Sequence, residues 1–202
     1  MFDVLIIGGG VSGISCALVL GSAKNKPFVS EKKIGIITHQ KASSLQDALF
    51  NNAYGIMPGK TGAELLNESV AHLSSAYPHV VQIPNEKVLQ VSGSPGNFVV
   101  KTNKSEYAAA IVVVAVGYAN TFFIDGLTQY VEPHLKSDPA KQRIQLVNND
   151  HKVADGIYVA GNLAGWRSQL SIAAGSGAAV ATDILTLWND GKQTQSHDKV
   201  AK

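Results

Sequence analysis

The sequence predicts an α/β protein with a three-layer, Rossmann-like domain, in which a parallel sheet carries helices on one face and a small antiparallel β-piece on the other. Three observations carry this prediction. An apolar, β-branched run over residues 2–7 leads directly into a glycine-rich turn and an alanine- and leucine-rich stretch to Ala23. Two later apolar runs, 108–116 and 156–161, each lead to a glycine and are typical of buried parallel strands. The composition, 45% hydrophobic and 16% charged, is that of a globular protein.

The first glycine turn has the spacing of a dinucleotide-binding fingerprint. Gly8 permits a tight turn, Gly10 lets the backbone approach a pyrophosphate, and Gly13 lets the helix pack closely on the strand. Val11 and Ser12 lie in the first turn of that helix, where unpaired N–H groups and the positive end of the helix dipole favour phosphate. A strand precedes the turn and a helix follows it. This context favours a nucleotide site over a purely structural turn.

A second apolar stub over residues 27–30 predicts the next strand, which ends in Glu31. Glu31 follows Gly13 by 18 positions, so its carboxylate, with Lys32 beside it, is expected to bind a ribose diol. The alternative is a solvent-exposed acid in a turn. The following segment is polar and irregular, with a short apolar patch at 34–37.

The rest of the chain alternates helix and strand signals. Thr61 and Glu64 have the spacing of a capping box and predict a helix that Pro78 ends. Residues 168–187 predict a second long helix, and the polar tail 191–202 is expected to be disordered. Short strands are expected at 80–83, 87–91, 98–102, 108–116, 144–147 and 156–161, with the antiparallel piece over 80–102.

Composition narrows the function classes. Cys16 is the single cysteine, which excludes an intrachain disulfide and a CxxC pair, and we expect it to be a buried apolar residue and not a reactive thiol. The six histidines lack metal-ligand spacing, so no metal is expected. No basic stripe predicts nucleic-acid binding, and the apolar run at 108–116 is too short to span a bilayer. Without a visible leader, a cytoplasmic location is expected.

Four segments resemble a known family. The run 155–162 is similar to the late flavoprotein motif that delivers a glycine and an acid to the FAD ribityl chain, and 168–177 resembles the helix after it. The run 110–117 resembles the strand-to-glycine motif that closes the FAD half, and 52–55 with 62–65 is similar to an N-x-P-G…G-x-E-L segment. The chain, over about residues 1–188, therefore resembles thioredoxin reductase-like members of the pyridine nucleotide-disulfide oxidoreductase family.

This resemblance implies FAD as the cofactor. It places Gly161 and Asn162 at the ribityl hydroxyls and pyrophosphate, and the N–H groups of Gln169 and Leu170 at the flavin pyrimidine edge. The other contacts that it implies are Val88 with adenine, Asn52 on the flavin side, and Ala115 and Gly117 in the strand-to-glycine motif. Each has a structural alternative: Gly161 ends a strand, Gln169 caps its helix, Val88 is core, and Asn52 is a turn residue.

Departures from the family pattern shape the expected function. Only about 38 residues, 118–155, separate the strand-to-glycine motif from the late motif, too few for a second nucleotide-binding unit. We therefore expect one FAD-binding domain over 1–190 without an inserted NADPH domain. The absence of CxxC excludes the family's dithiol route. Asn162 replaces the family's acid, and Ser168 stands where its arginine is usual, with Arg167 one place early.

The expected function is an FAD-dependent oxidoreductase that takes electrons from a partner protein or a diffusible reductant, in a homodimer. Two alternatives remain: a non-catalytic flavin-binding or flavin-sensing module, alone or as a subunit of a redox complex, and a small NAD-dependent dehydrogenase. No catalytic residue is assigned. His134 and His151 are expected as solvated loop histidines, with proton shuttling as the alternative. Trp166 is expected at the surface or a dimer contact.

Overall fold

A parallel sheet forms the centre of the protein. The computed structural model describes residues 1–39, 43 and 45–198. Five strands run parallel in the order β5-β2-β1-β8-β12, and β11 closes the sheet antiparallel to β12. Their bounds are β1 Phe2–Ile7, β2 Ile34–Thr38, β5 Val81–Pro84, β8 Glu106–Val114, β11 Lys152–Ala154 and β12 Ile157–Val159. The predicted Rossmann-like fold class is confirmed.

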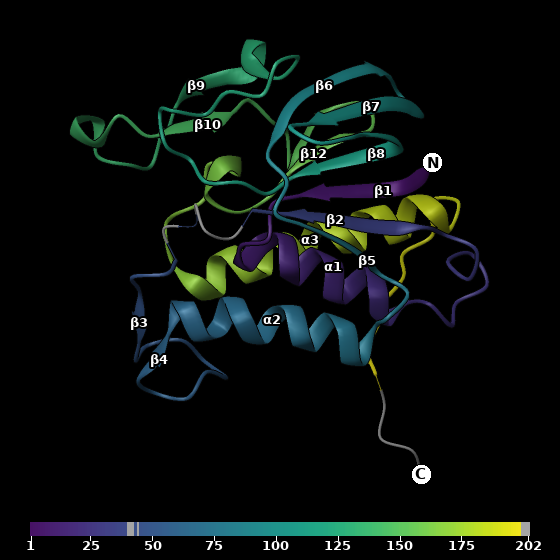
Figure 1. The fold of residues 1–202 in the computed structure, drawn as a ribbon, viewed down its shortest axis with the longest axis horizontal. Helices are drawn as coiled ribbons and strands as arrows, with labels where there is room; N and C mark the ends of the chain where they lie inside the picture. The colour runs from purple at the N-terminus through teal and green to yellow at the C-terminus, as the bar shows by residue number, and fades with distance from the viewer. Residues whose placement is uncertain (40–42, 44, 199–202) are drawn as a thin grey trace.

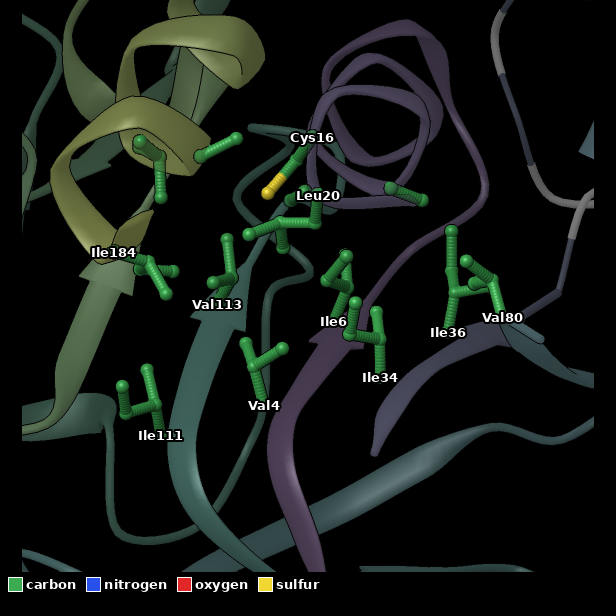
Figure 2. Close-up of a cluster of buried hydrophobic side chains, with 14 of the residues drawn as sticks. Val4, Ile6, Cys16, Leu20, Ile34, Ile36, Val80, Ile111, Val113 and Ile184 are labelled. Carbon is green, nitrogen blue, oxygen red and sulfur yellow. The ribbon is translucent and has the colours of Figure 1, made fainter. Parts of the chain in front are cut away.

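Three helices cover one face of this sheet (Figure 1). They are α1 (Val11–Ser22), α2 (Gly62–Ala76) and α3 (Leu170–Trp188). Figure 2 shows the core between them and the sheet, where Leu20 of α1 and Ile184 of α3 point toward Ile6 and Val113 of the central strands. All four of these side chains are fully buried. Burial of apolar surface of this kind contributes about 25 cal/mol per Å² and makes α1 and α3 integral to the core.

An antiparallel piece covers the other face (Figure 1). It consists of β6 (Val88–Ser94), β7 (Asn97–Thr102) and the first residues of β8. Val91, Phe98 and Val100 pack there against Leu5 and other residues of the parallel strands. The predicted antiparallel piece therefore exists, but the strand at 81–84 is not part of it, because β5 pairs in parallel with β2.

Short elements complete the chain. Residues 118–155 contain the 3-10 helices Thr128–Tyr130 and Pro139–Lys141, the strands β9 (Val131–Pro133) and β10 (Ile144–Leu146), and β11. β10 pairs with β9, and β3 (Leu49–Phe50) pairs with β4 (Lys60–Thr61). A further 3-10 helix, Gly161–Ala164, follows β12.

The second strand is not where the sequence predicted it. Residues 23–32 form successive turns, held by hydrogen bonds such as Lys26 N–H to Ala23 O and Val29 N–H to Lys26 O, both 2.9 Å. The stub at 27–30 has one fully buried residue, Val29, whereas all five residues of β2 are buried. A central parallel strand needs a continuous apolar run, and the patch at 34–37 supplies it.

Both long helices begin close to the predicted positions. The capping box is present in α2: Thr61 accepts from Glu64 N–H, and Glu64 accepts from Thr61 N–H at 2.8 Å. α3 has 19 residues and a mean hydropathy of 1.5, so by length and composition alone it could span a membrane. Its buried face, which includes Val180 and Ile184, makes α3 a core helix here.

The tail carries no helix or strand over residues 191–198. Ser196 Oγ lies 2.8 Å from Ser22 Oγ of α1, and Tyr77 donates a hydrogen bond to Asp198. These contacts tie this part of the tail to the helical face. Residues 199–202 lie outside the described residues, and disorder of the tail stays a prediction.

Candidate cofactor-binding site

The carboxyl ends of the central strands meet at one edge of the sheet. Gly8 follows β1, Ala115 follows β8 and Ala160 follows β12. Gly8 N–H donates to Ile37 O at 2.9 Å, and Ala160 N–H donates to Val114 O at 2.9 Å. The glycine turn, the strand-to-glycine motif and the late motif therefore lie side by side. This edge is where open α/β sheets bind ligands.

Two glycines of the turn are required by the fold itself. Gly8 has φ +117°, and a Cβ on it would lie 2.3 Å from Ala115 O. A Cβ on Gly13 would lie 1.9 Å from Gly8 O. The turn role predicted for Gly8 and the packing role predicted for Gly13 are thus confirmed. Ala115 is buried, and its backbone packs directly against Gly8.

Gly10 differs from both. It has φ −78° and ψ −175°, and a Cβ built on it would have no atom within 4 Å. Gly10 is the N-cap of α1, where no side chain caps the helix and no acid lies in the first turn. The positive end of α1, with Val11 and Ser12 in its first turn, therefore faces an open space. An anion such as a pyrophosphate fits that space.

Gly161 and Asn162 face this turn from the other side. Gly161 has φ +77°, and a Cβ on it would lie 2.7 Å from Ser12 Oγ. Asn162 Oδ1 is buried and has no hydrogen-bond partner among the described residues. A buried acceptor without a donor is costly, so this oxygen suits a ligand hydroxyl. The residues present fit the pyrophosphate and ribityl portion of FAD.

The start of α3 is capped by a side chain, and the predicted contacts of the Gln169 and Leu170 N–H groups with a flavin stay a prediction. Gln169 is its N-cap, and Gln169 Oε1 accepts from Ser171 N–H at 2.6 Å and from Ile172 N–H at 3.3 Å. The side chain of Gln169 therefore caps the helix, which was the structural alternative. Leu170, the first helical residue, is half-buried.

Glu31 and Lys32 are wrong as ribose contacts. They precede β2, so they lie at the amino edge of the sheet, at the opposite end of the strands from Gly8. Lys32 Nζ contacts Asp3 Oδ1 at 3.0 Å and lies over the Trp188 ring. The ribose contact was misplaced because the second strand was expected at residues 27–30, whereas it lies at Ile34–Thr38. After β2 the chain continues without a carboxylate until Asp47.

The remaining predicted contacts divide into core and surface. Val88 is 6% exposed and packs with Ile37 and Ile83, and its backbone pairs with Thr102. Asn52 is exposed in the loop between β3 and β4. Gly117 is exposed beyond β8, and a Cβ on it would meet nothing within 4 Å. Of these three, Gly117 alone adjoins the carboxyl edge with open space beside its backbone.

Comparison with solved structures identifies the fold. A thioredoxin reductase from Gloeobacter violaceus matches with a TM-score of 0.73 and 16% identity, over 100% of this chain and 99% of that one. An oxidoreductase from Agrobacterium tumefaciens matches with a TM-score of 0.70 and 15% identity, over 92% and 98%. The chain has the thioredoxin reductase fold. No family model matches it.

Two curated relatives are similar to the chain in sequence. Both carry the name "Uncharacterized oxidoreductase CzcO". The protein from Bacillus velezensis is 30% identical over 171 residues, and that from Bacillus subtilis is 28% identical over 174 residues. Each match covers 77% of this chain and 49% of the relative. The chain thus spans about half the length of the curated relatives it matches.

A cavity of about 430 Å³ lies beside the ends of β2 and β5, against α2. This size falls within the range of small-molecule pockets. Among the described residues no charged side chain lines it; the lining is formed by Thr38, Gln46, Ala63, Leu66, Asn67, Val70, Ser74, Gln82, Pro84 and Asn85. A carboxylate was expected directly after the second strand, to bind a ribose. The described side chains near the end of β2 that line this cavity carry amide and hydroxyl groups in its place.

Two histidines near the late motif are buried, contrary to the expectation of solvated loop residues. His134 is 7% exposed and His151 is 4% exposed. His134 Nε2 contacts the backbone of Asn162 and Trp166, and His151 Nε2 contacts Ser176 Oγ. Sequence spacing gave no signal for these contacts, because they join loops and helices distant along the chain.

Proposed function

We propose that this chain is an FAD-binding flavoprotein oxidoreductase that receives electrons from a partner protein or a diffusible reductant. Gly10 carries the proposal. The fold accounts for Gly8 and Gly13 by steric contact, but no atom of the described residues lies within 4 Å of a Cβ built on Gly10. This open space lies at the uncapped N-terminus of α1. A bound pyrophosphate accounts for it.

FAD would supply a reducible ring that accepts and passes on electrons. The chain's own residues would bind and orient it. The first turn of α1 would hold the pyrophosphate, and Asn162 Oδ1 would accept a hydrogen bond from a ribityl hydroxyl. The uncharged cavity that includes Thr38 and Asn85 would take the adenosine end. The thioredoxin reductase-like fold and the oxidoreductase names of the relatives support a redox role.

A non-catalytic flavin-binding module is the second candidate, and Gln169 favours it. Its side chain occupies the N–H groups of Ser171 and Ile172 at the start of α3. These two donors are therefore not available to a flavin, which reduces the number of N–H groups that could stabilise a reduced, anionic ring to those of Gln169 and Leu170. The single cysteine also removes a dithiol relay from the chain.

An absorbance spectrum of the purified protein, with and without added FAD, tests the proposal. We expect flavin bands that stay with the protein through gel filtration. Anaerobic addition of NADPH, and separately of dithionite, then distinguishes the two candidates. Bleaching by NADPH, or bleaching by one equivalent of dithionite followed by reoxidation by a quinone that is faster than that of free reduced FAD, supports the oxidoreductase. A protein that stays colourless with excess FAD refutes both, and tight binding of NAD in its place supports a dehydrogenase.

A cytoplasmic homodimer is proposed for the assembly. Leu49, Tyr54 and Met57 expose large apolar side chains on and between β3 and β4, with Tyr54 fully exposed. Exposed apolar groups that gather on one loop often mark an interface. Light scattering after gel filtration tests this: a mass of twice 21.3 kDa supports the dimer.

A further inference from the structure

The segment that follows β12 is held from two sides by buried histidines. This segment, residues 161–166, contains Gly161 and Asn162 of the proposed cofactor site. His134 reaches it from the loop after β9, and His151 reaches it from the turn before β11. Both side chains are more than nine-tenths buried. Their hydrogen bonds determine which ring nitrogen carries the proton.

His134 is fixed as a donor. His134 Nε2 lies 3.1 Å from Asn162 O and 3.2 Å from Trp166 O. Both carbonyl oxygens can only accept, so Nε2 carries the proton. His134 Nδ1 accepts from Lys136 N–H at 3.1 Å, which is possible only when that nitrogen is unprotonated. The neutral Nε2–H form therefore joins the two ends of the segment.

His151 is fixed as an acceptor. The indole N–H of Trp166 can only donate, and Trp166 Nε1 lies 3.0 Å from His151 Nε2. The His151 proton is thus on Nδ1, which is buried and has no hydrogen-bond partner among the described residues; Asp150 Oδ1 lies 3.5 Å away. The rings of His151 and Trp166 also stack, with centroids 5.9 Å apart.

Ser176 connects His151 to the cofactor site. Ser176 Oγ lies 2.9 Å from His151 Nε2, so the hydroxyl and the Trp166 N–H share the single lone pair of that nitrogen in a three-centre hydrogen bond. The same oxygen accepts the N–H of Gly161 at 2.8 Å. Since Gly161 has φ +77°, a sparsely populated conformation for most residues, this bond helps to hold the turn that faces Ser12.

We propose that His134 and His151 are positioning residues for the cofactor, which act as a clamp of two neutral histidines in opposite tautomers on residues 161–166. The Nε2–H of His134 orients Asn162 through its carbonyl group. The Nε2 lone pair of His151 orients Gly161 through Ser176 and fixes Trp166. This inference rests on the proposed cofactor site, but the clamp itself exists in the protein without a ligand.

Glutamine and leucine variants test the clamp. In His151→Gln the amide oxygen can still accept from Trp166 and Ser176, and in His134→Gln the amide N–H₂ can still donate to both carbonyls. Leucine can do neither. We expect His134→Leu and His151→Leu to weaken FAD binding by about tenfold or more, and the glutamine variants to recover most of that loss.

Amide hydrogen exchange of residues 161–166 in the FAD-free protein gives an independent readout. The leucine variants are expected to exchange faster there, while the glutamine variants keep wild-type protection. His79→Leu is the matched control. His79 Nε2 lies 3.0 Å from Gly21 O at the far end of α1, so its loss should change neither readout.

The outcomes separate the two proposals. If wild-type protein binds no FAD, the proposed function fails, and hydrogen exchange still decides the clamp. If FAD binds but glutamine and leucine variants weaken it equally, with equal exchange at 161–166, the clamp is wrong and the proposed function stands. If a leucine variant does not fold, the glutamine variant decides: weak FAD binding with fast exchange overturns the clamp.

Discussion

Ser12 on α1 lies against Gly161 near the end of the late motif, so closely that a Cβ on Gly161 would be 2.7 Å from Ser12 Oγ. A second glycine, Gly177 of α3, also faces Ser12: its Cβ would lie 2.0 Å from Ser12 O. The first and last motifs therefore pack with no room for a side chain between them. This close approach preforms the edge where the pyrophosphate is proposed to bind.

Gly161→Ala should disrupt this approach. Alanine is strained at φ +77°, and its Cβ would displace Ser12. We expect the free energy of unfolding to fall by about 1–3 kcal/mol and FAD affinity to fall at least tenfold. Gly175→Ala in α3 is the control, because its Cβ would meet nothing within 4 Å and alanine favours a helix. Urea unfolding and FAD titration of both variants measure the difference, and equal effects would contradict the argument.

Gly10→Ala should separate ligand binding from folding. The backbone at φ −78° accepts alanine, and the added methyl group points into open space. Stability without FAD should therefore fall by no more than about 1 kcal/mol, the cost of alanine in place of glycine at an N-cap. FAD binding should weaken at least tenfold, since the methyl group would stand where the pyrophosphate approaches. A variant that binds FAD normally would remove the main support for the cofactor site.

Glu31→Ala and Lys32→Ala should leave FAD affinity unchanged. Both residues lie at the amino edge of the sheet, away from the glycine turn. Lys32 forms a partly exposed ion pair with Asp3, so its loss should cost at most about 1 kcal/mol. FAD titration and thermal unfolding check this. A tenfold loss of FAD affinity in Glu31→Ala would show that the original sequence-based assignment was correct.

The strength of each sequence signal explains which predictions succeeded. β1, the glycine turn and α1 were located because hydrophobic pattern, turn chemistry and helix signals agree over residues 2–22. The second strand was misplaced because Phe28 and Val29 imitate a short strand, while the true strand follows a charged turn. Local sequence could not decide between the two, because pairing with β1 selects the strand.

The site was harder to predict where side chains have two uses. Gln169 can present an N–H to a ligand or cap its own helix, and only the geometry of the first turn of α3 shows the cap. His134 and His151 looked like loop residues because the loops are polar. Their burial arises from tertiary contacts with Asn162, Trp166 and Ser176, which no sequence spacing encodes.

Cys16 should be unreactive in the folded protein. It is fully buried in α1, and burial raises the pKa of its thiol, so the thiolate is scarce at neutral pH. We expect no reaction with a thiol reagent such as DTNB until the protein is unfolded in denaturant. The free energy of unfolding of Cys16→Ser should be lower by about 1–3 kcal/mol, because a hydroxyl without a partner replaces the thiol. Rapid labelling of native protein would contradict this.

Asp183 on α3 should give a pH-dependent contribution to stability. Burial, followed by the charge of Asp150, raises the pKa of its carboxyl group. As the pH falls through this raised value, the folded state binds a proton before the unfolded state, so this group's contribution to stability increases toward acid. Asp183→Asn should therefore be slightly more stable than wild type at pH 7, by under about 1 kcal/mol for so exposed a group.

The advantage of Asp183→Asn should shrink between pH 7 and pH 4, as measured by urea unfolding at several pH values. Asp155→Asn is a control in which the effect of pH on stability is expected to have the opposite sign. A hydrogen bond from Lys152, 2.6 Å from Asp155 Oδ1, lowers the pKa of Asp155, so its stabilising contribution is lost as the pH falls through the lowered value. Wild type should thus be more stable than Asp155→Asn at pH 7 and lose that advantage in acid. A difference between wild type and Asp183→Asn that does not change with pH would show that the surroundings of α3 do not perturb Asp183.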